Sequence, residues 1–229
     1  PRPPVPPRIH AADGALTAPS AEGNRTLAPL EAMPPVLVRA FVSAEDRHFW
    51  THSGVDPAAV ARAALTNLRN RGTGRRAVGA STITQQVVKN LVLGDEATLR
   101  RKLREALLAL RAEREVGKRR ILEIYLNEIY LGEGAYGVAA AAQAYFGKPL
   151  ARLGLAEAAF LAGLPKAPHN YHPLRRPEAA LARRAYVLGR MVEDGAATPE
   201  EAPAASAAPL PRPEARDLGG PAAGHFAEE

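Results

Sequence analysis

The sequence predicts a mainly α-helical fold, and three observations lead to that prediction. Apolar residues recur at helical spacing in several segments of the 229-residue chain. No run of alternating Val, Ile, Thr or Tyr residues predicts a strand, and aromatic residues make up only 5% of the chain. Glycines and prolines punctuate the periodic segments, where they end one helix and begin the next. The length suits one sizeable helical domain with short appendages.

The first helix follows Pro34 and Pro35. It carries Leu37, Phe41, Ala44 and His48 at helical spacing. Gly54 and Pro57 mark its end, so Glu45 and Asp46 are expected in its last turns. The remaining helices are expected from Pro57 to about Leu68, from Ser81 to Leu91, from Thr98 to Leu131 with a break at Gly117, from Val138 to Phe146, from Leu155 to Leu164 and from Pro177 to Asp194.

Composition divides the chain into three parts. Residues 1–29 are proline-rich and indicate an extended lead-in, and residues 30–198 form the expected domain. Residues 199–229 have the Ala/Pro-rich composition of a linker or of a segment that docks on another partner. The longest apolar stretches are too short for a membrane helix. The chain begins at Pro1 without a signal segment, so we expect an anchoring part upstream.

The charge is distributed unevenly. The net charge is +6, yet residues 62–120 alone hold 15 Lys and Arg against 5 Asp and Glu. Such a concentration of positive charge predicts an anionic partner, either a phosphate or diphosphate, nucleic acid or acidic lipid headgroups. The absence of cysteine excludes disulfides and thiolate metal sites.

The first candidate motif is EDRHFWTHSGVD, from Glu45 to Asp56. A carboxylate near a helix C-terminus meets the negative end of the macrodipole, which favours protonation and suits a general base. Glu45 is therefore a candidate base. The alternative is an ordinary helix end whose acids pair with neighbouring arginines. His48 and His52 lie four residues apart without the glutamate of a zinc-protease motif, so we interpret them as structural.

The second motif is GASTITQQVVKN, from Gly79 to Asn90, and it opens a helix with hydroxyl, amide and lysine side chains. Free N–H groups at such a helix start suit a diphosphate or sugar hydroxyls, although a Ser or Thr there commonly serves only as a cap. The third motif sets Arg101 and Lys102 before Glu105. Arg101 and Glu105 lie four residues apart on one helix face, and this spacing is also typical of an ordinary helix salt bridge.

Together, these motifs resemble those of glycosyltransferase family 51, the peptidoglycan polymerases that form the first catalytic domain of class A penicillin-binding proteins. The resemblance runs from about residue 30 to about residue 198 and includes the blocks RRILEIYLNEIYLG, GAYGVAAAAQAYFGK, LAGLPKAP and RRAYVLGRM. It implies a lysozyme-like helical glycosyltransferase fold with a mobile membrane-facing subdomain. One departure is Ala80, where the family usually has a second glycine. The tail GHFAEE is similar to the segment that leads into the transpeptidase domain of class A proteins, which implies that residues 199–229 lead toward such a domain.

The resemblance also implies residue roles. Glu45 matches the base that deprotonates the acceptor's sugar 4-hydroxyl, and Asp46 has a supporting catalytic role. Glu105 matches a glutamate near the reacting centre that in some members holds a divalent metal, Mg²⁺ or Mn²⁺. The expected substrate-binding residues are Ser81, Thr82, Gln86, Lys89, Asn90, Arg101, Lys102 and Lys166.

The implied reaction is the inverting transfer of the growing polyprenyl-diphosphate-linked glycan to the 4-hydroxyl of lipid II, which forms β-1,4 links in cell wall synthesis. A diphosphate leaves as an anion, so clustered cations serve it better than a second carboxylic acid does. The expected partners are lipid II, the nascent glycan strand, the inhibitor moenomycin and other cell-wall synthesis proteins. Nucleic acid is not expected. The expected location is the extracytoplasmic face of the bacterial cytoplasmic membrane.

Because both substrates carry polyprenyl tails, the cleft should open at the membrane surface. We expect Val60, Leu65 and Leu68 to contact lipid, although the same stripe also suits a core-facing helix. The arginines expected to meet anionic headgroups are those at positions 62, 69, 71, 75 and 76.

Two other functions compete with this interpretation. A lysozyme-like lytic enzyme would share the helical fold and a catalytic glutamate but would cleave finished glycan, and it would not need the cluster of Lys89, Arg101, Lys102 and Lys166. A basic nucleic-acid-binding module would explain the charge, but the sequence shows neither a recognition-helix motif nor interleaved stacking aromatics.

Overall fold

The computed structural model describes residues 24–25, 27–72, 79–90 and 98–213 and is mainly helical, as predicted. Its elements are β1 (Asn24–Arg25), η1 (Leu30–Ala32), α1 (Pro35–Glu45), α2 (Pro57–Arg69), α3 (Ile83–Val88), α4 (Leu99–Glu115), α5 (Lys118–Glu128), β2 (Ala135–Tyr136), α6 (Val138–Phe146), η3 (Leu150–Arg152), α7 (Leu155–Gly163), η4 (Pro168–Tyr171), α8 (Pro177–Glu193) and α9 (Glu201–Ala207).

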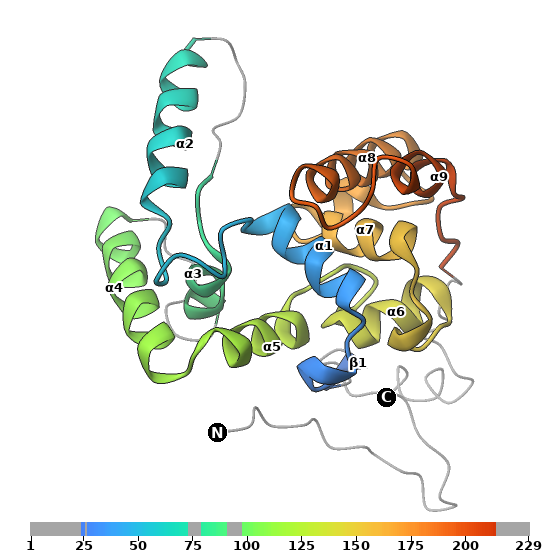
Figure 1. Ribbon diagram of the computed structural model, residues 1–229, viewed down its shortest axis with the longest axis horizontal. Coiled ribbons are helices and arrows are strands. Elements are labelled where there is room, and N and C mark those ends of the chain that lie inside the picture. The colour runs from blue at the N-terminus through green and yellow to red at the C-terminus, as the bar shows by residue number, and fades with distance from the viewer. Residues whose placement is uncertain (1–23, 26, 73–78, 91–97, 214–229) are drawn as a thin grey trace, which may run out of the picture.

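The helices form two groups joined by α1 and α5. Helices α6, α7, α8 and α9 gather on one side of α1, whereas α3 and α4 lie on the other and α2 projects away from both groups (Figure 1). Strand β1 pairs in parallel with β2, with Asn24 opposite Ala135. None of the helices in the described ranges is long and apolar enough to cross a bilayer.

The core lies where α1 packs against α7 and α8. Leu37 and Phe41 of α1 are fully buried, as are Leu161 of α7 and Val187 of α8. Helix α7 is rich in alanine, and small side chains let it pack closely between its neighbours. This packing fixes the C-terminal end of α1, where Glu45 lies.

Local sequence signals explain where the helices begin. Asp56 caps α2, accepting a hydrogen bond from the Ala59 N–H at 2.8 Å, and Pro57 occupies the first turn. Thr82 and Gln85 form a capping box at the start of α3. Gly117, with a φ of +79°, separates α4 from α5 at the predicted break.

The C-terminal part differs from the prediction. The composition of residues 199–229 predicts a linker, yet Glu201–Ala207 forms α9, which packs on α7 and α8. Buried Arg184 of α8 donates hydrogen bonds to the carbonyl oxygens of Ser206 at 2.8 Å and Pro209 at 3.3 Å, so it satisfies acceptors at the end of α9. Residues 214–229 lie outside the described residues.

The end of the lead-in and the first residue of the domain make hydrogen bonds to α5. The Ala28 N–H donates to Oδ1 of Asn127 at 2.8 Å, and the Leu30 N–H donates to Oε2 of Glu123 at 3.1 Å. These bonds tie the chain before α1 to α5. Residues 1–23 and 26 of the predicted lead-in lie outside the described residues, as do Arg75 and Arg76, which were expected to meet lipid headgroups.

Candidate active site

A groove of about 290 Å³ lies at the C-terminal end of α1. Its walls come from four parts of the chain: the end of α1, the first turns of α2, the segment before α3, and α8. The lining residues include Glu45, Asp46, Asp56, Arg62, Gly79, Ala80, Ser81, Thr82, Tyr186 and Arg190. The first two motifs predicted from the sequence therefore meet in one groove.

Glu45 is the last residue of α1 and is largely buried. The helix ends before His48, which the sequence pattern placed in it. Oε2 of Glu45 accepts a hydrogen bond from Nε2 of Gln86 at 3.1 Å, and its Oε1 lies 3.7 Å from a guanidinium nitrogen of Arg183. Burial raises the pKa of Glu45, while the Gln86 hydrogen bond and the charges of Arg183 and Lys166 oppose that rise. The predicted direction is thus confirmed, with burial as its main cause, and a carboxylate so placed suits proton abstraction.

Asp46 is tied into a buried hydrogen-bond network. Its Oδ2 accepts hydrogen bonds at 2.9 Å from the backbone N–H of Ile83 and from Nε2 of His52. The Gly54 N–H donates to Nδ1 of the same histidine at 3.0 Å, which places the imidazole proton on Nε2. His52 is therefore structural, as predicted, and Asp46 links the end of α1 to the start of α3.

The network continues behind His52. Glu113 of α4 accepts a hydrogen bond from the Thr84 hydroxyl at 2.6 Å and pairs with Nζ of Lys118 at 2.7 Å. Its carboxylate also lies 3.7 Å from Nδ1 of His52. Three helices thus converge on the first motif, and no local sequence pattern predicts this convergence because the partners are distant in the chain.

Glu105 lies at the centre of the third motif, and its side chain is only 2% exposed. Arg101 donates to Glu105 Oε2 at 2.9 Å, as expected for residues four apart on a helix, and Lys102 pairs with the other oxygen. The ammonium of Lys102 also contacts the Ser81 hydroxyl at 2.8 Å. Because Ser81 lines the groove, Lys102 connects the third motif to the site of Glu45.

The other predicted substrate-binding residues occupy different places around this site. The Thr82 hydroxyl donates to the Gly54 carbonyl oxygen at 2.7 Å and accepts from the Gln85 N–H, so it is engaged as a helix cap. Lys89 follows α3 and is partly exposed, and Asn90 beside it is exposed. Lys166 is exposed after α7, on the side that faces Glu45.

The sequence interpretation assigned no role to α8, which contributes three residues to this region. Arg183, Tyr186 and Arg190 are spaced three and four residues apart, so they share one helix face. Tyr186 and Arg190 line the groove and Arg183 faces Glu45. They fall within the block RRAYVLGRM, and their helical spacing is the signal that identifies them.

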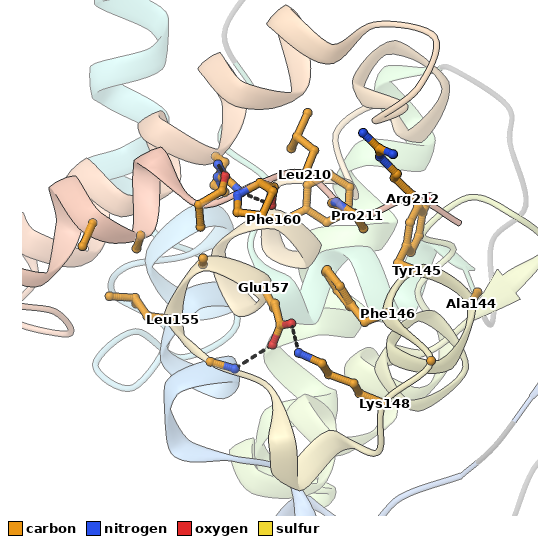
Figure 2. Close-up of a pocket in the computed structure, with 18 of the residues that line it drawn as sticks. Ala144, Tyr145, Phe146, Lys148, Leu155, Glu157, Phe160, Leu210, Pro211 and Arg212 are labelled. Carbon is orange, nitrogen blue, oxygen red and sulfur yellow. Dashed lines mark hydrogen bonds and ion pairs between the residues drawn. The ribbon is translucent and has the colours of Figure 1, made fainter. Parts of the chain in front are cut away.

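A larger cavity, of about 880 Å³, lies elsewhere, between α6, α7 and α9. Phe146 and Phe160 line it, and Figure 2 shows Glu157 paired with Lys148 beside them. The distance from Lys148 Nζ to Glu157 Oε1 is 2.5 Å. Glu157 also accepts the Gly154 N–H at 2.9 Å, completing a capping box at the start of α7. These charged groups have structural partners, so the smaller groove at Glu45 is the better candidate active site.

The described parts of the chain hold no group of three or more His, Asp or Glu side chains placed to bind a metal. Glu105 is the one predicted ligand, and both its oxygens already face cations. This donor set fits a divalent ion only where the substrate supplies other ligands, as Mg²⁺ bound through one carboxylate and phosphate oxygens does.

Comparisons with known proteins identify the family of this chain. The family model described as "Transglycosylase" matches residues 13–192. The chain is 51% identical to penicillin-binding protein 1A of Aquifex aeolicus over 199 residues, which cover 87% of this chain and 27% of that protein. It is 48% identical to penicillin-binding protein 1A of Escherichia coli K12, covering 86% of this chain and 23% of that protein.

The fold agrees as well. A crystal structure of penicillin-binding protein 1A from Haemophilus influenzae superposes with a TM-score of 0.52 at 29% identity, covering 89% of this chain and 20% of that one. The chain therefore spans about a quarter of the length of the relatives it matches. On the strength of the matched family model and these relatives, the chain belongs to the transglycosylase family.

Proposed function

We propose that this chain polymerises peptidoglycan glycan strands, transferring the growing polyprenyl-diphosphate-linked glycan to the 4-hydroxyl of lipid II with inversion. The observation that carries the proposal is a buried carboxylate, Glu45, in a groove that Ser81 joins to the cations of the third motif. Family membership supports the same reaction class.

In this mechanism Glu45 takes the proton from the acceptor hydroxyl. The freed oxygen attacks the anomeric carbon of the donor from the face opposite the diphosphate, and the bond to the diphosphate oxygen breaks. The leaving group departs as an anion and needs no proton, so Lys102 and Arg101 stabilise it by charge. Gln86 orients the base through its hydrogen bond at 3.1 Å.

The carboxylates of the groove favour transfer over hydrolysis by a lytic enzyme. An inverting glycosidase needs a general acid opposite its base. Asp46 accepts hydrogen bonds from Ile83 and His52 and has no proton donor role in that network. Burial raises the pKa of Asp56, but hydrogen bonds from Ala59 and His48 outweigh it, and the net shift lowers that pKa. Neither carboxyl group is suited to protonating a leaving sugar.

The polyprenyl tails of these substrates place the site at a membrane surface. Val60, Leu65 and Leu68 of α2 are 47%, 50% and 65% exposed, so the alternative in which they form a core is wrong. Leu103 and Leu107 of α4 add to the exposed apolar surface. We infer that this surface meets lipid on the extracytoplasmic face of the bacterial cytoplasmic membrane, with moenomycin competing for the groove and other cell-wall synthesis proteins as further partners.

A divalent ion, Mg²⁺ or Mn²⁺, belongs to the proposal as a substrate-shared ion at Glu105. When bound, it would neutralise charge on the departing diphosphate. Removing divalent ions with EDTA should then slow polymerisation, and Glu105→Gln should abolish the response to added ion. Full activity in EDTA would remove the ion from the proposal.

The test is polymerisation of lipid II by the purified chain in detergent, with glycan products resolved by gel electrophoresis. Wild type should yield polymer, and Glu45→Gln should yield none while keeping its helical circular dichroism. Glu115→Gln, at an exposed position on α4, is the matched control and should be active. Release of sugar fragments from purified cell walls without polymer formation would instead identify a lytic enzyme.

A further inference from the structure

Arg183 of α8 forms an ion pair with Glu45, the carboxylate of the candidate active site. One of its terminal nitrogens lies 3.7 Å from Glu45 Oε1, too far for a hydrogen bond but close enough for a strong charge interaction. The side chains of Arg183 and Glu45 are only 10% and 14% exposed, so solvent screens this pair weakly.

The guanidinium of Arg183 is held from several sides. Its Nε donates to the carbonyl oxygen of Gly163 at 3.1 Å, and its central carbon lies 4.9 Å from the ring centroid of Tyr186 and 5.8 Å from that of Tyr171. A guanidinium stacked on aromatic rings stays charged, and its planar group is held in one orientation. Arg183 therefore has a fixed place before any substrate arrives.

Gly163, at the end of α7, leaves room for this arrangement. A Cβ atom at that position would lie 2.9 Å from Cγ of Arg183, closer than real contacts of this kind. Gly163 is not among the glycines with positive φ, so alanine suits its backbone and only the arginine has to move. The glycine is thus explained by the position of Arg183 rather than by a turn.

The groups that face Glu45 come from every element packed against it. Asp46 follows it in the chain, Gln86 reaches it from α3, Tyr125 from α5, Lys166 from the segment after α7 and Arg183 from α8. Burial and Asp46 favour the protonated carboxyl group, whereas Gln86, Arg183 and Lys166 favour the carboxylate. Lys166 is exposed and Arg183 is not, so Arg183 is the cation whose position the fold determines.

We propose that Arg183 is a positioning residue for the base: held by Gly163, Tyr171 and Tyr186, it keeps the Glu45 side chain ionised and aimed into the groove at neutral pH. This rests on the proposed function, in which Glu45 accepts the proton of the acceptor hydroxyl. The part that Arg183 plays is electrostatic, because its Nε donates to Gly163 and its terminal nitrogen lies 3.7 Å from Glu45, beyond hydrogen-bond distance.

The experiment is the pH profile of kcat/KM for lipid II polymerisation by the full chain and its variants. In Arg183→Met the acidic limb should move up by about 1–2 pH units, because an adjacent arginine lowers a carboxyl pKa by about that much. At a pH below both limbs the rate should fall about 10- to 100-fold, and it should recover at high pH. Arg183→Lys should shift the limb less.

Two further variants separate position from charge. Gly163→Ala leaves the number of charges unchanged but displaces Arg183, and it should move the acidic limb in the same direction by a smaller amount. Arg175→Met removes an exposed arginine that precedes α8 and should leave the profile unchanged. Because Gly163→Ala keeps the arginine, it tests the proposal even where Arg183→Met fails to fold.

A second measurement does not depend on activity. In protein labelled with ¹³C at glutamate carboxyl carbons, the Glu45 signal is identified by its loss in Glu45→Gln and is titrated without substrate. Arg183→Met should raise its midpoint. An unmoved midpoint, or a rate loss equal at every pH, would overturn the positioning role. A wild-type chain that makes no polymer would refute the proposed function instead, while the titration would still decide the role of Arg183.

Discussion

The substitution Asp46→Ala should destabilise the protein strongly, because two buried donors would lose their acceptor. The Ile83 N–H and Nε2 of His52 both donate to Asp46 Oδ2 at 2.9 Å, and its side chain is 4% exposed. Each buried donor left unsatisfied costs about 1–3 kcal/mol. The free energy of unfolding should therefore fall by about 2–6 kcal/mol, a large part of the roughly 5–15 kcal/mol typical of a domain.

Urea unfolding followed by far-ultraviolet circular dichroism measures this loss. Glu115→Ala serves as the matched control, because it removes an exposed α4 carboxylate paired with Arg111 at 2.7 Å. That pair should contribute only about 0.2–0.5 kcal/mol. If Asp46→Ala cost no more than this control, the buried network would not stabilise the junction of α1 and α3, and our account of Asp46 would be refuted.

Three further predictions follow from other parts of the structure. Glu45→Gln should raise the free energy of unfolding at neutral pH, because burial raises the folded-state pKa of Glu45. The contribution of Glu45 to stability is favourable below its unfolded-state pKa and is lost as pH rises through the folded-state pKa, by about 1.4 kcal/mol for each pH unit between the two pKa values. Melting temperatures that differ from wild type by the same amount at pH 4 and pH 7 would contradict this prediction. Gly54→Ala should lower the free energy of unfolding in urea by at least about 2 kcal/mol, since φ is +100° and the new Cβ would lie 2.6 Å from the Ala109 carbonyl oxygen. Gly72→Ala is the control, with φ of +85° and no atom within 4 Å of the new Cβ, and it should lose only the stability that backbone strain costs. Leu65→Ser with Leu68→Ser should reduce flotation with anionic liposomes, whereas Leu174→Ser, which is equally exposed on another part of the molecule, should not.

Much of the helical layout could be predicted because local signals determine helix ends. Gly117 separates α4 from α5 where the break was expected, and α6 has the predicted bounds of Val138 and Phe146. The periodicity of α2 left two readings open, because a stripe of apolar residues suits either a core or a lipid surface. The structure, in which Leu68 is 65% exposed, excludes the core, and contact with lipid stays a prediction.

The predictions failed where the outcome depends on distant partners. The Ala/Pro composition of residues 201–207 resembles a linker, yet α9 forms because α7, α8 and Arg184 supply a surface and hydrogen-bond donors for it. The same reason explains why Arg183 was missed. The ion pair of Arg183 and Glu45 joins residues 138 positions apart, and no local sequence pattern predicts such a contact.

The short helix α3 explains why Glu45 and Asp46 are adjacent, because it donates a hydrogen bond to each of them. Ile83 and Gln86 lie three residues apart on one helix face, and they donate to Asp46 and Glu45 respectively. The bond from Ile83 sets the position of α3, and that position sets the distance from Gln86 to the base. Thr84, bonded to Glu113, holds the same helix from α4. A displacement of α3 would therefore change the support of both carboxylates at once, which links the stability of the junction to the orientation of the base.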